Sequence, residues 1–218
     1  MPRRTTDYRG LTEINRVRLL GVIQDHPDLT LKALAEAVGL HVNTTRDHLG
    51  VLIDEGFVSS RPRPCGSRGR PPIVYRAVDD AEMNAAARRR IDHVREVGPV
   101  LRRIGMACQP ARVRELGDDA GEQFDTLVEH LDDSGLEPVA DDTELRVSLA
   151  ACPHLQLDGA ERTMACTVHA RLLRDILAQV PGPLEIDGVE PFRTQNTCEL
   201  RLLAEESHAA ERVCPAAS

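Results

Sequence analysis

Aromatic side chains are scarce in this chain. Its 218 residues include no tryptophan, two tyrosines and three phenylalanines. Recognition of unpaired bases depends on stacking against aromatic rings, so this composition disfavours binding of single-stranded nucleic acid. Long apolar runs are also missing, because no stretch approaches the roughly 18 residues that a membrane-spanning helix needs. Arg3 and Arg4 are not followed by the apolar segment of a secretory signal. We therefore expect a cytoplasmic protein without membrane contact.

The net charge of −8 conceals two halves of opposite character. Residues 1–104 hold 18 basic and 13 acidic side chains, whereas residues 105–218 hold 9 and 22. A basic half allows a polyanionic partner even though the whole chain is acidic. The shortage of aromatic residues makes double-stranded DNA the favoured nucleic acid.

The first third carries a helix-turn-helix pattern. Apolar residues recur at helical spacing up to Ile23, and Pro27 ends that segment because proline cannot donate a backbone hydrogen bond. Thr30 is a good N-cap for a short second helix, and Gly39 is placed to end it in a left-handed conformation. A third helix is predicted over about 41–55. Two helices joined by a short glycine-containing turn are typical of a helix-turn-helix.

The third helix has polar residues near its start. Asn43, Thr44 and Arg46 are predicted to face outward and read bases, with His48 at the flank holding phosphate. A helix fits the major groove of B-DNA, where arginine pairs with guanine and asparagine with adenine. Because any solvated helix face is polar, this pattern alone leaves DNA binding and simple solvation open.

A basic hairpin follows. Residues 56–61 and 73–77 are predicted to form paired strands, and the tip between them contains no carboxylate. Arg68, Gly69 and Arg70 place two guanidinium groups on a slim backbone, which suits contact with phosphates or a narrow minor groove. Solvated loops usually mix charges of both signs, so we favour a DNA-contacting wing.

Three stretches resemble winged helix-turn-helix regulators of the ArsR/MarR-like kind. They are Leu34–Leu40, Thr44–Leu49 and Leu52–Val58, which are similar to that family's helix-turn-helix, recognition helix and first wing strand. The resemblance implies a winged-helix DNA-binding domain.

Residues 81–106 are predicted to form a long helix with one apolar stripe, which Gly98 and Pro99 should kink or split. The stripe either packs on its own domain or pairs with a second copy. Duplex readers of this type commonly bind palindromic sites as two-fold dimers, so we expect a homodimer on a palindromic operator.

The second half is predicted to be a small acidic α+β domain. Helices are expected up to Gly135 and over 161–180, with strands at 144–150, 184–189 and 197–203. The predicted fold class is therefore α+β. It comprises a winged helix-turn-helix at 1–80, a linking and dimerisation helix at 81–118, and a C-terminal α+β sensor domain at 119–218.

Three of the six cysteines lie on elements of this second half. Cys152 follows a strand, Cys166 lies on a helix one turn before His169, and Cys198 opens a strand. Thiols from separate elements can converge and bind zinc or an iron–sulfur cluster. Buried cysteines also simply pack as small apolar residues. Spacing alone, without a C-x-x-C pair, leaves both interpretations open.

The sequence around these cysteines is similar to the C-terminal domain of regulators that resemble the suf-operon repressor. The matching stretches are Leu149–Pro153, Met164–His169, Leu172–Leu177 and Thr197–Arg201. Those regulators resemble this chain across nearly its full length and are winged-helix dimers that hold an iron–sulfur cluster. The resemblance implies a four-iron or two-iron cluster bound by Cys152, Cys166 and Cys198.

The fourth ligand of such a cluster is open, because residues 168–197 contain no cysteine. His169 is the first candidate, since it lies one helical turn from Cys166. His154, Cys214 and a small exogenous group are the alternatives.

Other functions compete with a cluster-controlled repressor. The same DNA-binding chain is compatible with a zinc site, a thiol-redox switch or a small organic effector. Cys-Pro pairs at Cys152 and Cys214 also permit haem. An enzyme with Cys166 as nucleophile and His169 as base lacks a third orienting group nearby. We therefore expect a regulator and not an enzyme.

Overall fold

Local capping signals set the ends of the first three helices. The computed structural model describes residues 10–64, 70–104, 109–141, 143–150, 152–154, 156–194 and 197–204. Helix α1 (Ile14–Asp25) is capped by the Glu13 carboxylate. Helix α2 (Leu31–Val38) starts at Thr30, whose hydroxyl accepts a hydrogen bond from the Ala33 amide, and ends at Gly39 with φ 69°. Helix α3 (Val42–Asp54) is capped by the imidazole of His41. The predicted helix-turn-helix is thus present.

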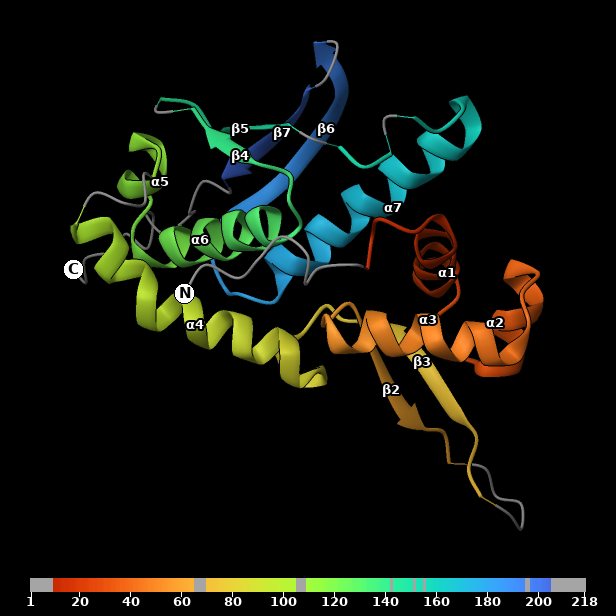
Figure 1. The fold of residues 1–218 in the computed structure, drawn as a ribbon. Helices are drawn as coiled ribbons and strands as arrows, with labels where there is room; N and C mark the ends of the chain where they lie inside the picture. Colours follow the sequence, from red (N-terminus) through yellow and green to blue (C-terminus); the bar gives the residue numbers. More distant parts are fainter. Residues whose placement is uncertain are drawn as a thin grey trace, which may run out of the picture.

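A three-stranded antiparallel sheet completes the winged helix. Strands β2 (Val58–Pro62) and β3 (Ile73–Ala77) pair as predicted, with Ser60 opposite Tyr75. The sheet order is β1-β3-β2, and the two-residue strand β1 (Leu29–Thr30) was not predicted from the sequence. The hairpin projects away from the rest of the chain (Figure 1).

A short 3-10 turn (Ala81–Met83) leads into the long helix α4 (Ala85–Arg103). The helix runs through Pro99 without being split. Its apolar stripe, which includes Ile91 and Val94, is buried and packs on α6 (Asp118–Asp133). The part of the stripe at Ile91 and Val94 is therefore covered within the chain, whereas Ile104 of the same stripe and its neighbour Val100 stay exposed at 58% and 50%.

The second half is a four-stranded antiparallel sheet of order β4-β5-β7-β6. Its other elements are α5 (Ala111–Glu115), β4 (Pro138–Ala140), β5 (Arg146–Leu149), α7 (Gly159–Ala178), β6 (Leu184–Thr194) and β7 (Thr197–Ala204). Alternation along β7 buries Cys198, Leu200 and Leu202. Helices α6 and α7 lie on the same side of this sheet in Figure 1. Helix α5 and strand β4 were not predicted.

Helix α7 belongs to two hydrophobic cores. Leu173 and Leu177 pack with α6 and the four-stranded sheet. Val168, Leu172 and Ile176 pack instead with the core of the winged helix. The two cores alternate along α7 because residues three and four apart share a helix face. One helix therefore ties the C-terminal half to the DNA-binding half.

Candidate nucleic-acid interface and thiol site

The first turns of α3 present the predicted base-reading residues to solvent. Asn43, Thr44 and Arg46 are exposed, while the inward side of the helix is held by buried Leu49 and Leu52. The Arg46 guanidinium donates a hydrogen bond to the Asn43 side-chain oxygen at 2.9 Å. Asn43 thereby orients the one arginine of this helix, whose planar fork matches the acceptor pair on guanine.

His48, unlike the other predicted DNA-contacting residues of α3, is largely buried. Its side chain is 16% exposed, and its Nε2 lies 3.7 Å from the Glu13 carboxylate at the start of α1. His48 thus links α3 to α1, and less of its surface is available to a phosphate.

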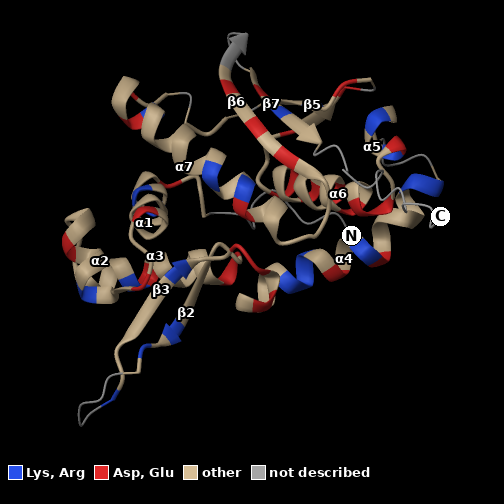
Figure 2. Cartoon of the chain, turned by 180° about the vertical axis from the view of Figure 1, so that it is seen from behind, with Lys and Arg blue, Asp and Glu red and all other residues tan. Residues whose placement is uncertain are grey.

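Of the basic wing residues predicted to contact DNA, the structure describes one, and it shows two further exposed arginines that were not predicted as DNA contacts. Arg70 is exposed, whereas Arg68 and Gly69 lie outside the described residues. On the strand side of the tip, Arg61 and Arg63 are also exposed. Figure 2 shows blue segments along the wing and red segments along β6, so the contrast between halves seen in the charge count is also spatial. The absence of acidic residues from the sequence segment 56–78, which contains Arg61 and Arg63, was the available signal.

Asp28 clamps the base of the wing. Its backbone has a φ of 65°, a left-handed conformation that aspartate tolerates better than most residues. Its carboxylate accepts hydrogen bonds from Arg61 at 3.1 and 3.0 Å and from Arg76 at 2.9 Å. Partial desolvation alone would raise the pKa of Asp28, but these two arginines hold it below its usual value.

The fold brings the three predicted cysteine ligands together. Cys198 stands opposite Leu149 in the β5–β7 ladder, so the chain that leaves β5 places Cys152 beside it. The two thiols share a hydrogen bond, and Cys166 on α7 is close enough for its charge to interact with both. None of the three forms a disulfide with another described cysteine. Separate elements thus bring Cys152 and Cys198 into contact and Cys166 into their electrostatic neighbourhood. Cysteine sulfurs are the donors that iron–sulfur clusters use.

The surroundings keep the thiols of Cys152 and Cys166 protonated. The hydrogen bond with Cys198 and then burial raise the pKa of Cys152. Burial and the neighbouring Cys198 raise the pKa of Cys166, although Arg162 opposes this. A bound metal deprotonates the thiols that coordinate it, so metal binding at this place would release protons.

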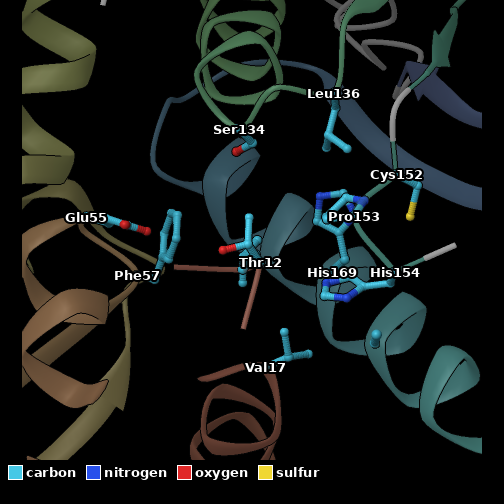
Figure 3. Close-up of a pocket in the computed structure, with 12 residues that line it drawn as sticks. Thr12, Val17, Glu55, Phe57, Ser134, Leu136, Cys152, Pro153, His154 and His169 are labelled. Carbon is cyan, nitrogen blue, oxygen red and sulfur yellow. The ribbon is translucent and has the colours of Figure 1, made fainter. Parts of the chain in front are cut away.

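His169 faces a cavity between the two halves of the chain. The cavity has a volume of about 30 Å³, room for one or two water molecules. Figure 3 shows the rings of His154 and His169 next to each other in its wall, with the sulfur of Cys152 beyond them. Cys166 does not line this cavity. His169 therefore shares a space with Cys152, although it lies only one turn from Cys166.

Both histidines of the cavity are held neutral. Burial, and then repulsion from His154, lowers the pKa of His169 to about 4. Within the part of the chain that the structure describes, His169 Nε2 is buried without a hydrogen-bond partner. Burial lowers the pKa of His154, although a hydrogen bond with the Leu11 backbone opposes the shift. A neutral imidazole nitrogen without a partner is suited to accept a proton donor or to bind a metal.

The described residues contain no group of three or more His, Cys, Asp or Glu side chains arranged to hold a single metal ion. The three sulfurs are therefore not set in the close shell that a lone zinc ion takes. In a four-iron cluster each cysteine sulfur binds its own iron atom, so the ligands lie farther apart than those of a single ion. The sulfur donors fit an iron–sulfur cluster in chemistry.

Comparisons with known proteins find a match in the first half of the chain. Residues 13–59 match the family model described as winged helix-turn-helix DNA-binding. No curated protein matches the chain, and no solved structure matches it either. In the described residues no helix is long and apolar enough to cross a membrane. The matched segment covers α1, α2, α3 and the start of the wing, so the chain carries a winged helix-turn-helix DNA-binding domain, which supports a role as a DNA-binding regulator.

Proposed function

We propose that this protein is a homodimeric transcriptional repressor whose affinity for a palindromic operator is set by an iron–sulfur cluster. Cys152, Cys166 and Cys198 would bind the cluster. The observation that carries the proposal is the meeting of these three thiols, from a loop, a helix and a strand, in a chain that also has a winged helix-turn-helix. The resemblance to suf-operon-repressor-like regulators supports the same assignment.

The residues of the winged helix divide into two roles. Asn43, Thr44 and Arg46 would read base edges from the major groove, because they are exposed at the start of α3. Arg70, with Arg61 and Arg63, would hold the phosphate backbone from the wing. Base contacts carry the sequence preference, and phosphate contacts supply affinity and register.

The cluster, when bound, supplies a redox-active and chemically labile iron centre that oxidants or iron shortage can remove. His169 would complete its ligands. The supporting observations are its buried, unpartnered Nε2 among the described residues and its place in the same cavity as Cys152. The neutral state of His169 is the form that a metal requires.

The second copy would dock on the end of α4. The stripe containing Ile91 and Val94 is occupied by α6, so the available apolar side chains on this helix are Val100 and Ile104. They lie four residues apart and therefore share one helix face. A two-fold contact there would pair each wing with one half-site.

The test is an absorbance spectrum with iron and acid-labile sulfide analysis on protein purified without oxygen. The wild type should be coloured and contain both elements. Cys152→Ser, Cys166→Ser and Cys198→Ser should each lose them, whereas the matched control Cys65→Ser, in the wing, should keep them. A colourless wild type, or three serine variants that keep iron and sulfide, would rule out the cluster.

A thiol switch is the second candidate, because the Cys152 and Cys198 thiols already share a hydrogen bond. Treatment of the metal-free protein with hydrogen peroxide would oxidise the two thiols to a disulfide, while the peroxide takes up the two thiol hydrogens and is reduced to two water molecules. Mass spectrometry of the peptides would identify that pair. A DNA affinity that changes with this disulfide, in protein that binds no iron, would favour the switch over the cluster.

A further inference from the structure

Helix α7 lies between the thiol site and the DNA-binding domain. Figure 1 shows it running from beside the four-stranded sheet to α1. Cys166 belongs to the thiol site, and its chain neighbours Ala165 and Val168 are buried in the winged-helix core. Because one turn of a packed helix moves as a unit, a ligand that repositions Cys166 also repositions these two residues.

Helices α7 and α1 approach each other closely at one point, where Gly21 faces Val168. A Cβ atom at Gly21 would lie 2.8 Å from Val168 Cγ2, so the two helices approach as closely as a glycine allows. Both residues are buried. Close approach of this kind is a recognised reason for glycine inside a helix.

Polar contacts on both sides of Gly21 hold the two helices in register. Arg18 pairs with Glu161, and Asp25 with Arg171 at 2.5 Å. The Gln24 amide donates to the Val168 carbonyl at 3.4 Å. These contacts oppose sliding of one helix past the other. A translation or rotation of α7 should therefore displace α1 as well.

Helix α1 in turn supports the recognition helix. Leu20 of α1 and Leu49 and Leu52 of α3 belong to one buried cluster. His48 of α3 also reaches Glu13 at the start of α1. A displacement of α1 thus reaches the side of α3 that faces away from the exposed Asn43 and Arg46.

We propose that α7 transmits the state of the thiol site to the DNA-binding domain, and that the contact between Val168 and Gly21 is where α1 receives it. This inference rests on the proposed function, since it names how the thiol site regulates DNA binding. Gly21 and Val168 are positioning residues, because neither is expected to touch DNA or a cluster.

The first experiment measures coupling as a ratio of affinities. The full chain, either reconstituted anaerobically with ferrous iron and sulfide or metal-free, is titrated onto a fluorescent duplex selected from random sequences by the wild type. For the wild type the two dissociation constants should differ by about 5-fold or more, the usual range of allosteric coupling. Gly21→Ala should bring them within about 2-fold, because the added methyl separates α1 from Val168. Gly159→Ala is the matched control, since a Cβ there meets nothing within 4 Å.

A second readout needs no cluster. Coupling is reciprocal, so DNA binding should change the environment of Cys166 in the metal-free chain. The rate at which N-ethylmaleimide alkylates Cys166, followed by peptide mass spectrometry, should change on addition of the duplex in the wild type and in Gly159→Ala. The rate should not change in Gly21→Ala. If that variant fails to fold, Val168→Ala takes its place. It removes the contact by truncating the valine side chain, whereas Gly21→Ala inserts a methyl group between the helices.

The outcomes separate the two proposals. Full coupling in Gly21→Ala and Val168→Ala overturns the role of this contact and leaves the regulator intact. If the wild type takes up no iron, the cluster proposal is wrong. The alkylation rates alone then test whether α7 transmits the state of the thiol site. If the alkylation rate of Cys166 in the wild type is the same with and without the duplex, transmission through α7 is refuted.

Discussion

The imidazole of His130 on α6 stands edge-on to the ring of Phe57, with centroids 5.6 Å apart and an interplanar angle of 87°. Phe57 lies between α3 and the wing, so this pair is another buried contact between the two halves of the chain. Arg90 of α4 approaches the same ring at 5.9 Å from its centroid. His130 is fully buried, and among the described residues neither ring nitrogen has a hydrogen-bond partner.

The protein should lose stability as the pH falls below about 6.5. Burial, then Arg90 and His169, lowers the pKa of His130 well below its usual value, and the pKa of His169 falls to about 4. Below about pH 6.5 the unfolded chain binds protons at both sites that the folded chain does not bind. Each site then costs about 1.4 kcal/mol of unfolding free energy per pH unit.

Asp175 opposes this trend. Burial is the main reason that its pKa is raised to about 6, so the folded chain takes up a proton there before the unfolded chain does. The expected net loss from His130, His169 and Asp175 is therefore about 1.4 kcal/mol per pH unit between about pH 6 and pH 4, and His154, whose pKa is also lowered by burial, adds to it. Urea unfolding at several pH values measures it. In Asp175→Asn the slope should steepen, and in His130→Leu it should become shallower; a slope that both variants leave unchanged would contradict the assignment.

Base-reading and phosphate-binding residues should separate by their sequence dependence. Arg46→Ala should cost about 1–3 kcal/mol of binding free energy on the preferred duplex and relax the sequence preference, because its proposed contacts are to base edges. Arg70→Ala should weaken binding to all sequences and lower the salt slope by about one. Fluorescence anisotropy on a panel of duplexes at several salt concentrations distinguishes the two. Equal losses on every sequence for both variants would refute the division of roles.

Asn43 should act partly through Arg46. The two side chains share a 2.9 Å hydrogen bond, so each single alanine variant already loses the oriented arginine. The double variant should therefore lose less affinity than the sum of the two single losses. A double-mutant cycle on the preferred duplex measures this difference, and strict additivity would show that the pair does not act together on DNA.

Removing the charge of Asp28 should strengthen DNA binding. Asp28→Asn keeps a residue that accepts the left-handed backbone and releases Arg61 and Arg76 from their carboxylate partner. Affinity for all duplexes should rise, and the salt slope should steepen by about one. Glu36→Gln on α2 changes the net charge equally and serves as the control. An equal gain in both variants would indicate general charge and not release of the wing.

The ligand role of His169 has its own test. In His169→Ala the reconstituted protein should release iron to a chelator about tenfold faster or more, as expected for a weakened metal site. Ser134→Ala, which alters a lining residue of the same cavity and removes no candidate ligand, should release iron at the wild-type rate. Equal release from His169→Ala and the wild type would remove His169 from the cluster.

The sequence by itself was sufficient for features that depend on a few neighbouring residues. The cap at Thr30, the left-handed Gly39 and the pairing of β2 with β3 all follow from local chemistry: a hydroxyl that accepts from the backbone, a glycine without Cβ, and a hairpin. The exposed Asn43, Thr44 and Arg46 follow from helical periodicity. For the same reason the match to winged helix-turn-helix domains covers this compact segment, residues 13–59.

Only the tertiary structure decided how distant segments share their surfaces. An apolar stripe does not identify its partner, so the choice between a dimer contact and α6 for the stripe of α4 depended on packing. The cysteines meet because the β5–β7 register places Cys198 opposite Leu149, and a register is set by the whole sheet. The double role of α7 arises because two faces of one helix are buried in two different cores. Burial against remote residues is a property of the folded chain, and local sequence does not encode it.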